Sequence, residues 1–291
     1  MNINFLATTT GSRQDLFEDL VVSYNDLLIP TGFNVHLFVL DQSPTIHNDI
    51  FRRNPPNFGK NITRVESRSL LGLSVARNRL LARLNGDCYV IFCDDDATYP
   101  PDFLVKLQGE FINAGQVDIG IFNLLNKGGV ETYGGRWYPS RSRFLLKHEV
   151  VNLAISLNLI IKLECINAVG GFNVELGVGS KGFCGEETEL ILKIIDSGAR
   201  ANYFSSPIAY HPKQELPTID QKKIYNYSRG YREMLLSYKG SLYLKTLVRL
   251  HLAIAILKSL LALIVFWRQR KSRLIKLKGL LGIGFNETSY D

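Results

Sequence analysis

Three consecutive carboxylates, Asp94, Asp95 and Asp96, are the residues of this chain best suited to chemistry. They follow the apolar run 88–93, which is typical of a buried strand, and ligands bind at the carboxyl ends of strands in open α/β sheets. Buried neighbouring carboxylates are unfavourable unless a cation or hydrogen-bond donors neutralise them. A hard divalent ion such as Mg²⁺ or Mn²⁺ would do so, together with the oxygens of a substrate diphosphate. The alternative is an exposed acidic turn before a helix, which the helix dipole favours without any metal.

The elements that must position these carboxylates are predicted from the hydrophobic pattern. Apolar, β-rich runs alternate with helical periodicity through the first half of the chain, which indicates a mixed α/β fold with a largely parallel sheet covered by helices. The predicted strands lie near residues 3–9, 33–40, 61–65, 88–93, 117–123 and 201–204. The predicted helices span residues 13–28, 73–84, 101–113 and 186–196.

A series of motifs in this chain resembles the family 2 glycosyltransferases of the GT-A fold. Leu71-Gly-Leu-Ser-Val-Ala-Arg77-Asn78, a helix, the turn 85–87 and the acidic turn 94–96 follow that family's order and spacing. Upstream, Asp41-Gln42-Ser43 stands where the family usually has an Asp-Asp-Gly-Ser-like turn. Downstream, the similarity continues at residues 170–172, 176–177, 185–190 and 210–211, so that it covers roughly residues 3–212. The resemblance implies a GT-A-like, Rossmann-type mixed sheet flanked by helices.

The resemblance also implies a binding site for a nucleoside-diphosphate sugar. Asp41 and Arg77 would lie at the nucleoside with Thr8 beside them, Asp95 would lie near the ribose, and Asp94 would complete the acidic turn. Asp96 would hold the cofactor, Mn²⁺ or Mg²⁺, and His211 matches a family position that can add an imidazole ligand. Without the resemblance, Arg77 could be a surface cation of a helix, Thr8 and Asp41 turn residues, and His211 a loop residue before Pro212.

Glu186 and Glu187 match a Glu-Asp pair of the same family, in which the second carboxylate deprotonates the acceptor hydroxyl. Glu187 replaces that Asp with the same chemistry but one more methylene, so its reach differs. Acidic residues in the first turn of a helix are also stabilised by the helix dipole alone. The resemblance therefore implies an inverting transfer of a sugar with Glu187 as the catalytic base and Glu186 beside it.

Two other functions fit part of this pattern. Asp94-x-Asp96-x-Thr98 after an apolar strand also resembles the motif of haloacid-dehalogenase-like phosphatases, in which the first Asp attacks phosphorus and the second is the acid/base. That motif normally ends the first strand, whereas three predicted strands precede it here. A non-catalytic module that binds a nucleotide sugar is the other alternative, and the intact acidic turn and the Glu pair argue against it.

The basic residues of the chain are concentrated in its C-terminal tail. The net charge is +7, and residues 234–286 contain ten Lys or Arg and no Asp or Glu, so the remainder is slightly acidic. A nucleic-acid-binding protein spreads its cations over a folded face, so no nucleic-acid partner is expected. Cations flank the apolar run 250–267, which favours a helix lying on an anionic membrane surface. A membrane-spanning helix, or a helical hairpin packed against the domain or a partner subunit, remains an alternative.

The sequence thus predicts two regions: a GT-A glycosyltransferase domain at residues 1–237 and a basic, apolar helical tail at residues 238–291. Residues 1–13 lack the basic flank and cleavage site of a secretory signal, and the four cysteines lack disulfide-dense spacing. A cytoplasmic location, peripheral on the cytoplasmic membrane face, is expected. A membrane-associated tail makes a lipid-linked saccharide a reasonable acceptor.

Overall fold

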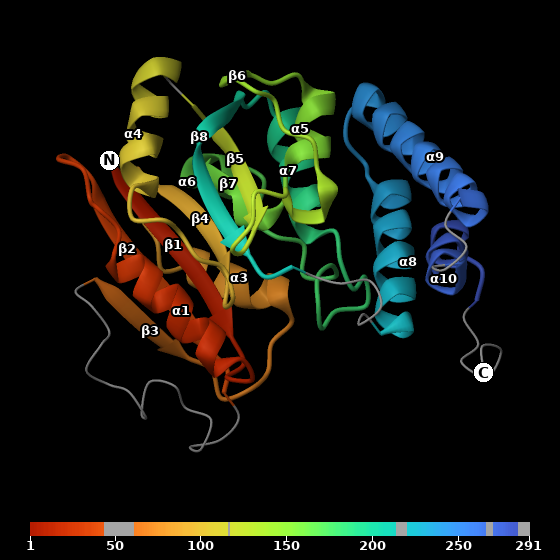
Figure 1. The fold of residues 1–291 in the computed structure, drawn as a ribbon, viewed down its shortest axis with the longest axis horizontal. Coiled ribbons are helices and arrows are strands. Elements are labelled where there is room, and N and C mark those ends of the chain that lie inside the picture. The colour runs from red at the N-terminus through yellow and green to blue at the C-terminus, as the bar shows by residue number, and fades with distance from the viewer. Residues whose placement is uncertain (44–60, 116, 214–219, 266–269, 285–291) are drawn as a thin grey trace.

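The computed structural model describes residues 1–43, 61–115, 117–213, 220–265 and 270–284, and Figure 1 follows them along the chain. Within these residues, eight strands form one mixed sheet. They are β1 (Asn2–Thr9), β2 (Asn34–Asp41), β3 (Ile62–Glu66), β4 (Tyr89–Asp94), β5 (Ile119–Asn126), β6 (Arg143–Phe144), β7 (Leu159–Lys162) and β8 (Ala201–His211). Their order across the sheet is β3-β2-β1-β4-β7-β5-β8-β6.

Strand direction explains why one edge of the sheet collects polar residues. β1 runs parallel to β2 and β4. β7 is antiparallel to both β4 and β5, so β5 and its parallel neighbour β8 run in the same direction as β4. The carboxyl ends of these strands therefore share one edge, where ligands bind in α/β sheets. The last residues of β1, β2, β4 and β8 are Thr9, Asp41, Asp94 and His211.

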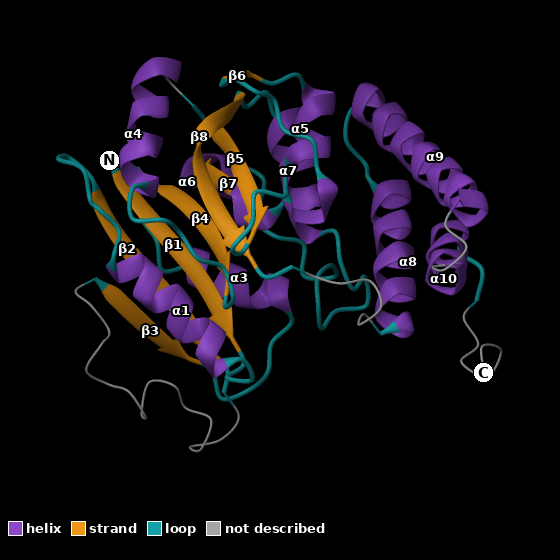
Figure 2. Cartoon of the chain, viewed as in Figure 1, coloured by secondary structure: helices purple, strands orange, loops and turns teal. Residues whose placement is uncertain are grey.

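Helices cover both faces of the sheet (Figure 2). The α-helices are α1 (Gln14–Asn25), α3 (Leu73–Leu81), α4 (Phe103–Ala114), α5 (Lys147–Leu153), α6 (Leu163–Ala168), α7 (Glu186–Asp196), α8 (Gln221–Ser237), α9 (Leu242–Val265) and α10 (Arg270–Leu281), and two short 3-10 turns are η3 (Tyr133–Gly135) and η4 (Ser156–Asn158). α1 and α4 bury their apolar side chains in one cluster, on one face of the sheet. α3, α6 and α7 contribute to the second cluster, on the other face.

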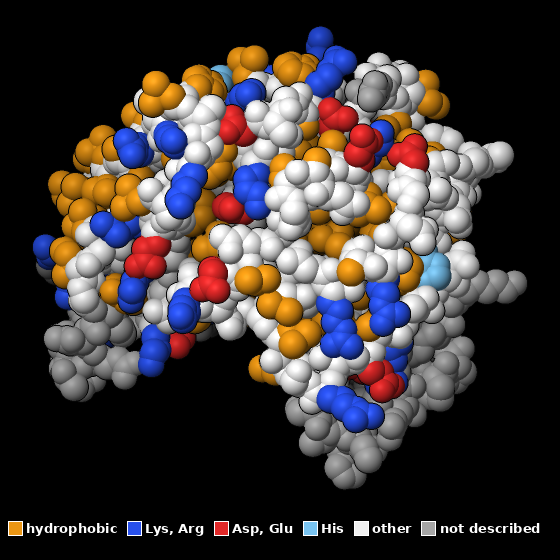
Figure 3. All heavy atoms as spheres, turned by 180° about the vertical axis from the view of Figure 1, so that it is seen from behind, with side chains coloured by type: hydrophobic (Ala, Val, Ile, Leu, Met, Phe, Trp, Pro, Cys, Tyr) orange, Lys and Arg blue, Asp and Glu red, His pale blue; other side chains and the backbone are white. Residues whose placement is uncertain are grey.

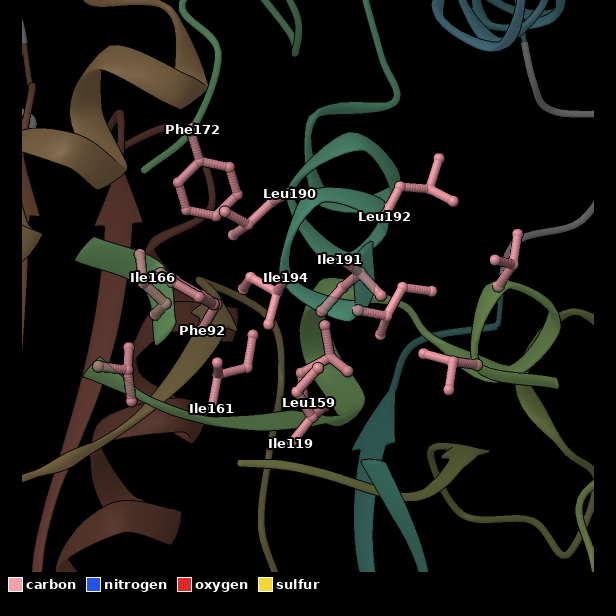
Figure 4. Close-up of a cluster of buried hydrophobic side chains, with 14 of the residues drawn as sticks. Phe92, Ile119, Leu159, Ile161, Ile166, Phe172, Leu190, Ile191, Leu192 and Ile194 are labelled. Atoms are coloured by element: carbon pink, nitrogen blue, oxygen red, sulfur yellow. The ribbon is translucent and has the colours of Figure 1, made fainter. Parts of the chain in front are cut away.

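The apolar face of α7 fixes this helix to the sheet, as Figure 4 shows. Leu190, Ile191 and Ile194 are almost completely buried in one cluster with Phe92 of β4 and Ile161 of β7. Burying a side chain of this size contributes about 1.5–3 kcal/mol. This packing holds the N-terminus of α7, where the two glutamates lie, in a defined position relative to the end of β4.

The predicted mixed sheet flanked by helices is confirmed, with differences in its second half that include the unpredicted two-residue strand β6. β8 does not end near residue 204 but continues through a register shift to His211. Ser205-Ser206-Pro207 interrupts the hydrophobic pattern, which is why a shorter strand was predicted. β7 was not predicted because α6 begins at the next residue, without a glycine or proline to mark the boundary.

Three helices follow the sheet and pack beside it. α10 packs against α8, and α9 contacts both (Figure 1). Leu244 and Val248 of α9 are buried in the same apolar cluster as Leu192 of α7. The proposed division between residues 237 and 238 thus falls between helices that share a core, and it stays a prediction.

α9 contains most of the apolar run predicted in the tail. By length and composition this helix of 24 residues could cross a membrane. Residues 266 and 267, which end the predicted run 250–267, lie outside the described residues.

Candidate active site

Three potential metal ligands come together at the carboxyl edge of the sheet. Thr98, just after the acidic turn, exchanges backbone hydrogen bonds of 3.0 and 2.8 Å with Tyr210 of β8. This pairing brings His211 to the acidic turn: its Nε2 lies 3.0 Å from Asp96 Oδ1 and 3.9 Å from Asp94 Oδ2. One ligand atom from each of Asp94, Asp96 and His211 lies within 4.8 Å of the others.

The chemistry of this Asp94–Asp96–His211 cluster fits a divalent cation. Carboxylate oxygens suit Mg²⁺ and Mn²⁺, and imidazole is a common ligand of transition metals. Asp96 Oδ1 is buried and accepts no hydrogen bond of good geometry from the described residues, although His211 Nε2 is close to it. His211 Nδ1 lies 2.9 Å from the carbonyl oxygen of Pro212, a contact that orients Nε2 toward the carboxylates. The structure thus brings together both predicted metal ligands and adds Asp94.

Burial and nearby charges set the protonation of the cluster. Burial raises the pKa of Asp94, and the opposing positive charge of Arg77 does not fully offset it. Burial alone would raise the pKa of Asp96 too, but contact with His211 and the charge of Arg13 outweigh it and lower this pKa. Burial lowers the pKa of His211, whereas the carboxylate of Asp96 raises it, and the net shift is upward. The carboxylates therefore favour a cation in this position.

Thr9 and Arg13 were not singled out from the sequence, yet both contact the acidic turn. The Thr9 hydroxyl donates a hydrogen bond of 3.0 Å to Asp95 Oδ2. The Arg13 guanidinium, about half exposed, forms ion pairs with both Asp95 and Asp96. Alternation along β1 was the available signal for Thr9, since the buried residues Ile3, Phe5 and Ala7 place position 9 on their side of the strand. For Arg13, the only sequence signal of a role in the site was its position in the loop after a strand.

Arg77 links the acidic turn to the start of α7. Its guanidinium is buried and lies 3.4 Å from Asp94 Oδ1 and 3.2 Å from Glu186 Oε1. The aromatic rings of Phe92 and Phe172 flank it, with centroids 5.6 and 5.4 Å away. The alternative of a surface cation does not describe this side chain, because Arg77 is only 3% exposed.

The two glutamates at the start of α7 differ in environment. Glu186 is buried and paired with Arg77, and burial, followed by the negative charge of Glu187, raises the pKa of Glu186 to about 8. Glu187 is partly exposed and lies close enough to Asp94 to raise the pKa of that carboxyl. Of the pair, Glu187 is therefore the carboxylate with access to a ligand at the acidic turn.

Asp41 and Thr8 lie along the same edge of the sheet. Asp41 is buried, and its Oδ2 accepts hydrogen bonds from Arg64 Nε at 3.0 Å and from a second Arg64 nitrogen at 2.6 Å. Its Oδ1 accepts hydrogen bonds from the backbone and hydroxyl of Ser43. Thr8 lies opposite Asp94 in the parallel pairing of β1 and β4. The roles of Asp41 and Thr8 at the nucleoside stay predictions.

The helix that carries Arg77 also holds the loop leading to α7, which explains why these motifs occur together. The Asn78 side chain donates to the carbonyl of Phe172 at 2.8 Å and accepts from its N–H at 2.9 Å. Ser74 donates to the carbonyl of Leu176 at 2.7 Å. At Gly177, where φ is +95°, a Cβ would lie only 2.9 Å from the Ser74 hydroxyl, so a side chain would disturb this contact.

Comparison with known proteins agrees with this architecture. The model of glycosyl transferase family 2 matches residues 32–156. The structure of TarS 1-349 from S. aureus in complex with UDP-GlcNAc is similar, with a TM-score of 0.64 and 17% identity over 97% of this chain and 81% of that chain. The mannosyltransferase PcManGT from Pyrobaculum calidifontis, in complex with GDP-Man and Mn²⁺, has a TM-score of 0.58 and 16% identity over 96% of this chain and 87% of that chain.

The chain spans 41% of the length of a longer TarS structure, at a TM-score of 0.61 and 14% identity. No curated protein sequence matches the chain significantly. The resemblance to family 2 glycosyltransferases is nevertheless confirmed: the family match contains Asp41, Arg77 and the acidic turn, and the chain has the GT-A fold.

Proposed function

We propose that this chain is an inverting, metal-dependent glycosyltransferase that moves a sugar from a nucleoside-diphosphate donor to an acceptor hydroxyl. The observation that supports this most is the Asp94–Asp96–His211 cluster at the carboxyl edge of a GT-A sheet, with Glu187 nearby. The similar structures are complexes with UDP-GlcNAc and with GDP-Man and Mn²⁺, so both types of donor are suitable first probes.

Asp96 and His211, together with Asp94, would hold Mn²⁺ or Mg²⁺. When bound, the cation supplies positive charge to the diphosphate leaving group. The haloacid-dehalogenase-like alternative requires Asp94 as a nucleophile at the end of the first strand, whereas Asp94 ends β4 and is paired with Arg77. A non-catalytic binding module would need no base, and the position of Glu187 favours an enzyme.

The nucleotide would lie along the carboxyl edge from β2 to β4. Asp41 at the end of β2 and Thr8 near the end of β1 are proposed to lie at the nucleoside, and Asp95 near the ribose. Arg77 is proposed to act from the same edge, where it contacts Asp94 and Glu186. The positive charge of Arg77 lowers the cost of burying the carboxyl groups of Asp94 and Glu186 near each other.

Glu187 is the proposed base that takes the proton of the acceptor hydroxyl. A neutral carboxyl cannot accept that proton, and the raised pKa of Glu186 keeps it protonated for a large part of the time near neutral pH. Glu186 is therefore proposed to position its neighbour, through the hydrogen bond that its Oε1 accepts from Arg77.

We propose a saccharide that is part of a lipid-linked molecule as the acceptor, because the basic, apolar tail favours a location on the cytoplasmic face of an anionic membrane. The proposed partners are therefore a nucleotide sugar, a saccharide acceptor and a membrane surface.

The activity is tested with the full chain, a panel of nucleotide sugars that includes UDP-GlcNAc and GDP-Man, and Mn²⁺. We expect release of the nucleoside diphosphate from one donor, and loss of this release when a chelator removes the metal. p-Nitrophenyl phosphate is the comparison substrate. Its turnover without consumption of any nucleotide sugar would support the phosphatase alternative and contradict the proposal.

The assignment of the base is tested by exchanging each glutamate in turn. Glu187→Gln should lower the transfer rate by roughly a hundredfold or more, the scale of general-base catalysis, while donor affinity stays nearly unchanged. Glu186→Gln serves as the matched variant, because it changes the neighbouring carboxyl in the same way. A far larger loss of turnover in Glu186→Gln would show that the wrong carboxylate has been assigned.

A further inference from the structure

The outward face of α9 is an apolar stripe along the whole helix. It consists of Tyr243, Leu250, Ile254, Leu257, Leu261 and Ile264. These side chains are 40–80% exposed. Hydrophobic side chains gather at the left of Figure 3, the side on which α9 lies. Steps of three, four and seven residues place them in one line on an α-helix. Soluble surfaces rarely expose a continuous apolar stripe of this length without a binding function.

The opposite face of α9 packs against the protein. Leu244, Val248 and Leu252 are at most 7% exposed and lie in the apolar cluster beneath the helix. α9 thus has two apolar faces, one packed against the protein and the other, the apolar stripe, directed outward. Hydropathy alone did not show this arrangement, because both faces of the helix are apolar.

Two cations border the stripe. At about 100° per residue, Arg249 lies roughly a quarter turn to one side of Leu250, and Lys258 lies roughly a quarter turn to the other side. Both side chains are exposed. Long cationic side chains in this position can reach the headgroups of a bilayer while neighbouring apolar side chains enter its boundary.

We propose that the stripe is a membrane-contact surface and that α9 lies in the plane of an anionic bilayer. The apolar side chains would enter the boundary between headgroups and acyl chains, and Arg249 and Lys258 would contact anionic headgroups. This inference deepens the membrane location proposed above by naming the face that binds, and it does not depend on the assignment of the catalytic residues.

Burial argues against a membrane-spanning α9. A spanning helix would have to separate Leu244, Val248 and Leu252 from the core that they now occupy. Each of these side chains contributes to the packing of α9 on the rest of the protein. An in-plane helix keeps this packing and buries the stripe as well.

Charge argues against a second copy of the chain as the occupant. The exposed cations Arg249 and Lys258 border the stripe, and residues 234–286 contain no acidic residue, so pairing the stripes of two copies would bring like charges together. An anionic surface compensates the same charges. The observations therefore favour a bilayer over a homodimer.

The test compares binding of the full chain to vesicles that contain phosphatidylglycerol and to vesicles of phosphatidylcholine alone. We expect cosedimentation with the anionic vesicles, and weaker binding as salt rises. The double variant Leu250→Asp/Leu257→Asp should lower vesicle affinity by roughly tenfold or more, because two apolar side chains no longer enter the bilayer. Arg249→Gln and Lys258→Gln should each lower it by about fivefold before screening.

Ile112→Asp is the matched control, since Ile112 is 75% exposed on α4, away from the tail. It should retain vesicle binding, and all variants should keep the melting temperature of the wild type. Absence of vesicle binding by the folded wild type, or unchanged binding by the double Asp variant, would overturn the proposal. So would a dimer in sedimentation equilibrium that Leu257→Asp dissociates, or attachment that resists alkaline carbonate, as a spanning helix does.

Metal-dependent binding of UDP and GDP is measured in the same preparations. Vesicle binding without nucleotide binding would contradict the transferase and leave the contact surface standing. Nucleotide binding without vesicle binding would contradict the contact surface and leave the transferase standing. The two proposals can therefore fail separately.

Discussion

Arg13 pairs with two of the three carboxylates of the acidic turn, and one of these is the proposed metal ligand Asp96. A divalent ion and a guanidinium compete for the same carboxylate. Arg13→Gln should therefore raise the affinity for Mn²⁺, measured by calorimetry without nucleotide, by roughly two- to fivefold, the scale of a partly exposed ion pair.

Arg83→Gln removes an exposed cation from the segment after α3 and controls for the change in net charge. It should leave the affinity for Mn²⁺ almost unchanged. If Arg13→Gln instead weakened Mn²⁺ binding, Arg13 would be holding the carboxylates in place for the metal rather than competing with it.

Glu186 should affect how the free energy of unfolding depends on pH. Its pKa is raised from 4.5 to about 8, chiefly by burial. Between these values the native state keeps a proton that the unfolded chain releases, so this group lowers the free energy of unfolding as pH rises from about 4.5 to about 8. Glu186→Gln removes this contribution, and the variant should become more stable relative to the wild type across that range.

Urea denaturation at several pH values measures this difference. Glu175→Gln, which changes an exposed glutamate in the loop before α7, is the control and should follow the pH profile of the wild type. A Glu186→Gln profile parallel to that of the wild type would show that Glu186 is ionised in the native protein as in the unfolded chain.

At the scale of elements, α8 is held against the loop that leads into α7. A Cβ at Gly230 of α8 would lie 2.1 Å from the carbonyl oxygen of Gly182, an impossible contact with the backbone. Gly230→Ala should force the helix and the loop apart and lower the free energy of unfolding by about 1–3 kcal/mol. Because this loop precedes Glu186, donor turnover should fall as well.

Gly109 of α4 provides the matched control in another helix. A Cβ there meets no atom within 4 Å, and alanine is the better helix former. Gly109→Ala should raise the free energy of unfolding by up to about 1 kcal/mol. Urea denaturation of both variants tests the pair, and equal effects of the two substitutions would contradict the close packing of α8 on the loop.

The elements also show what could be predicted from the sequence. β1, β2, β3 and β4 have strong alternation or continuous apolar runs between turn residues, so their positions followed from local pattern. β7 is a strand of four residues that leads directly into α6, and only its pairing between β4 and β5 identifies it. Tertiary pairing, rather than local propensity, decided this element.

In the whole molecule, the candidate site contains both residues that the sequence predicted and contacts that only the folded structure shows. The acidic turn and Glu187 were predicted as parts of the site because their residue types lie in motifs of the sequence. The contacts of Arg13, Thr9 and Arg77 were not predictable, since they depend on how segments far apart in the chain meet in space. The pairing of Thr98 with Tyr210, which brings His211 to the acidic turn, also has no local sequence signal.

The outward and inward faces of α9 could not be distinguished from the sequence either. Its composition is apolar on both faces, so periodicity could not assign one face to the core and the other to a partner. Packing of Leu244 and Val248 in the core makes that assignment. The remaining face is the surface proposed to contact the bilayer.

If the chain binds a nucleotide sugar through a metal held by Asp96, nucleotides should stabilise the folded protein only when that metal is present. UDP, GDP, UDP-GlcNAc and GDP-Man are added to the full chain with and without Mn²⁺, and the melting temperature is recorded for the wild type, Asp96→Asn and the exposed control Asp26→Asn. A ligand that binds only the native state stabilises it by about 2.7 kcal/mol at a hundredfold excess over its dissociation constant. We expect at least one ligand to raise the melting temperature of the wild type and Asp26→Asn only when Mn²⁺ is present, and to leave folded Asp96→Asn unchanged. An equal, metal-dependent shift in Asp96→Asn would show that Asp96 does not hold the metal, and a shift that needs no metal in the wild type would show that the donor binds without one.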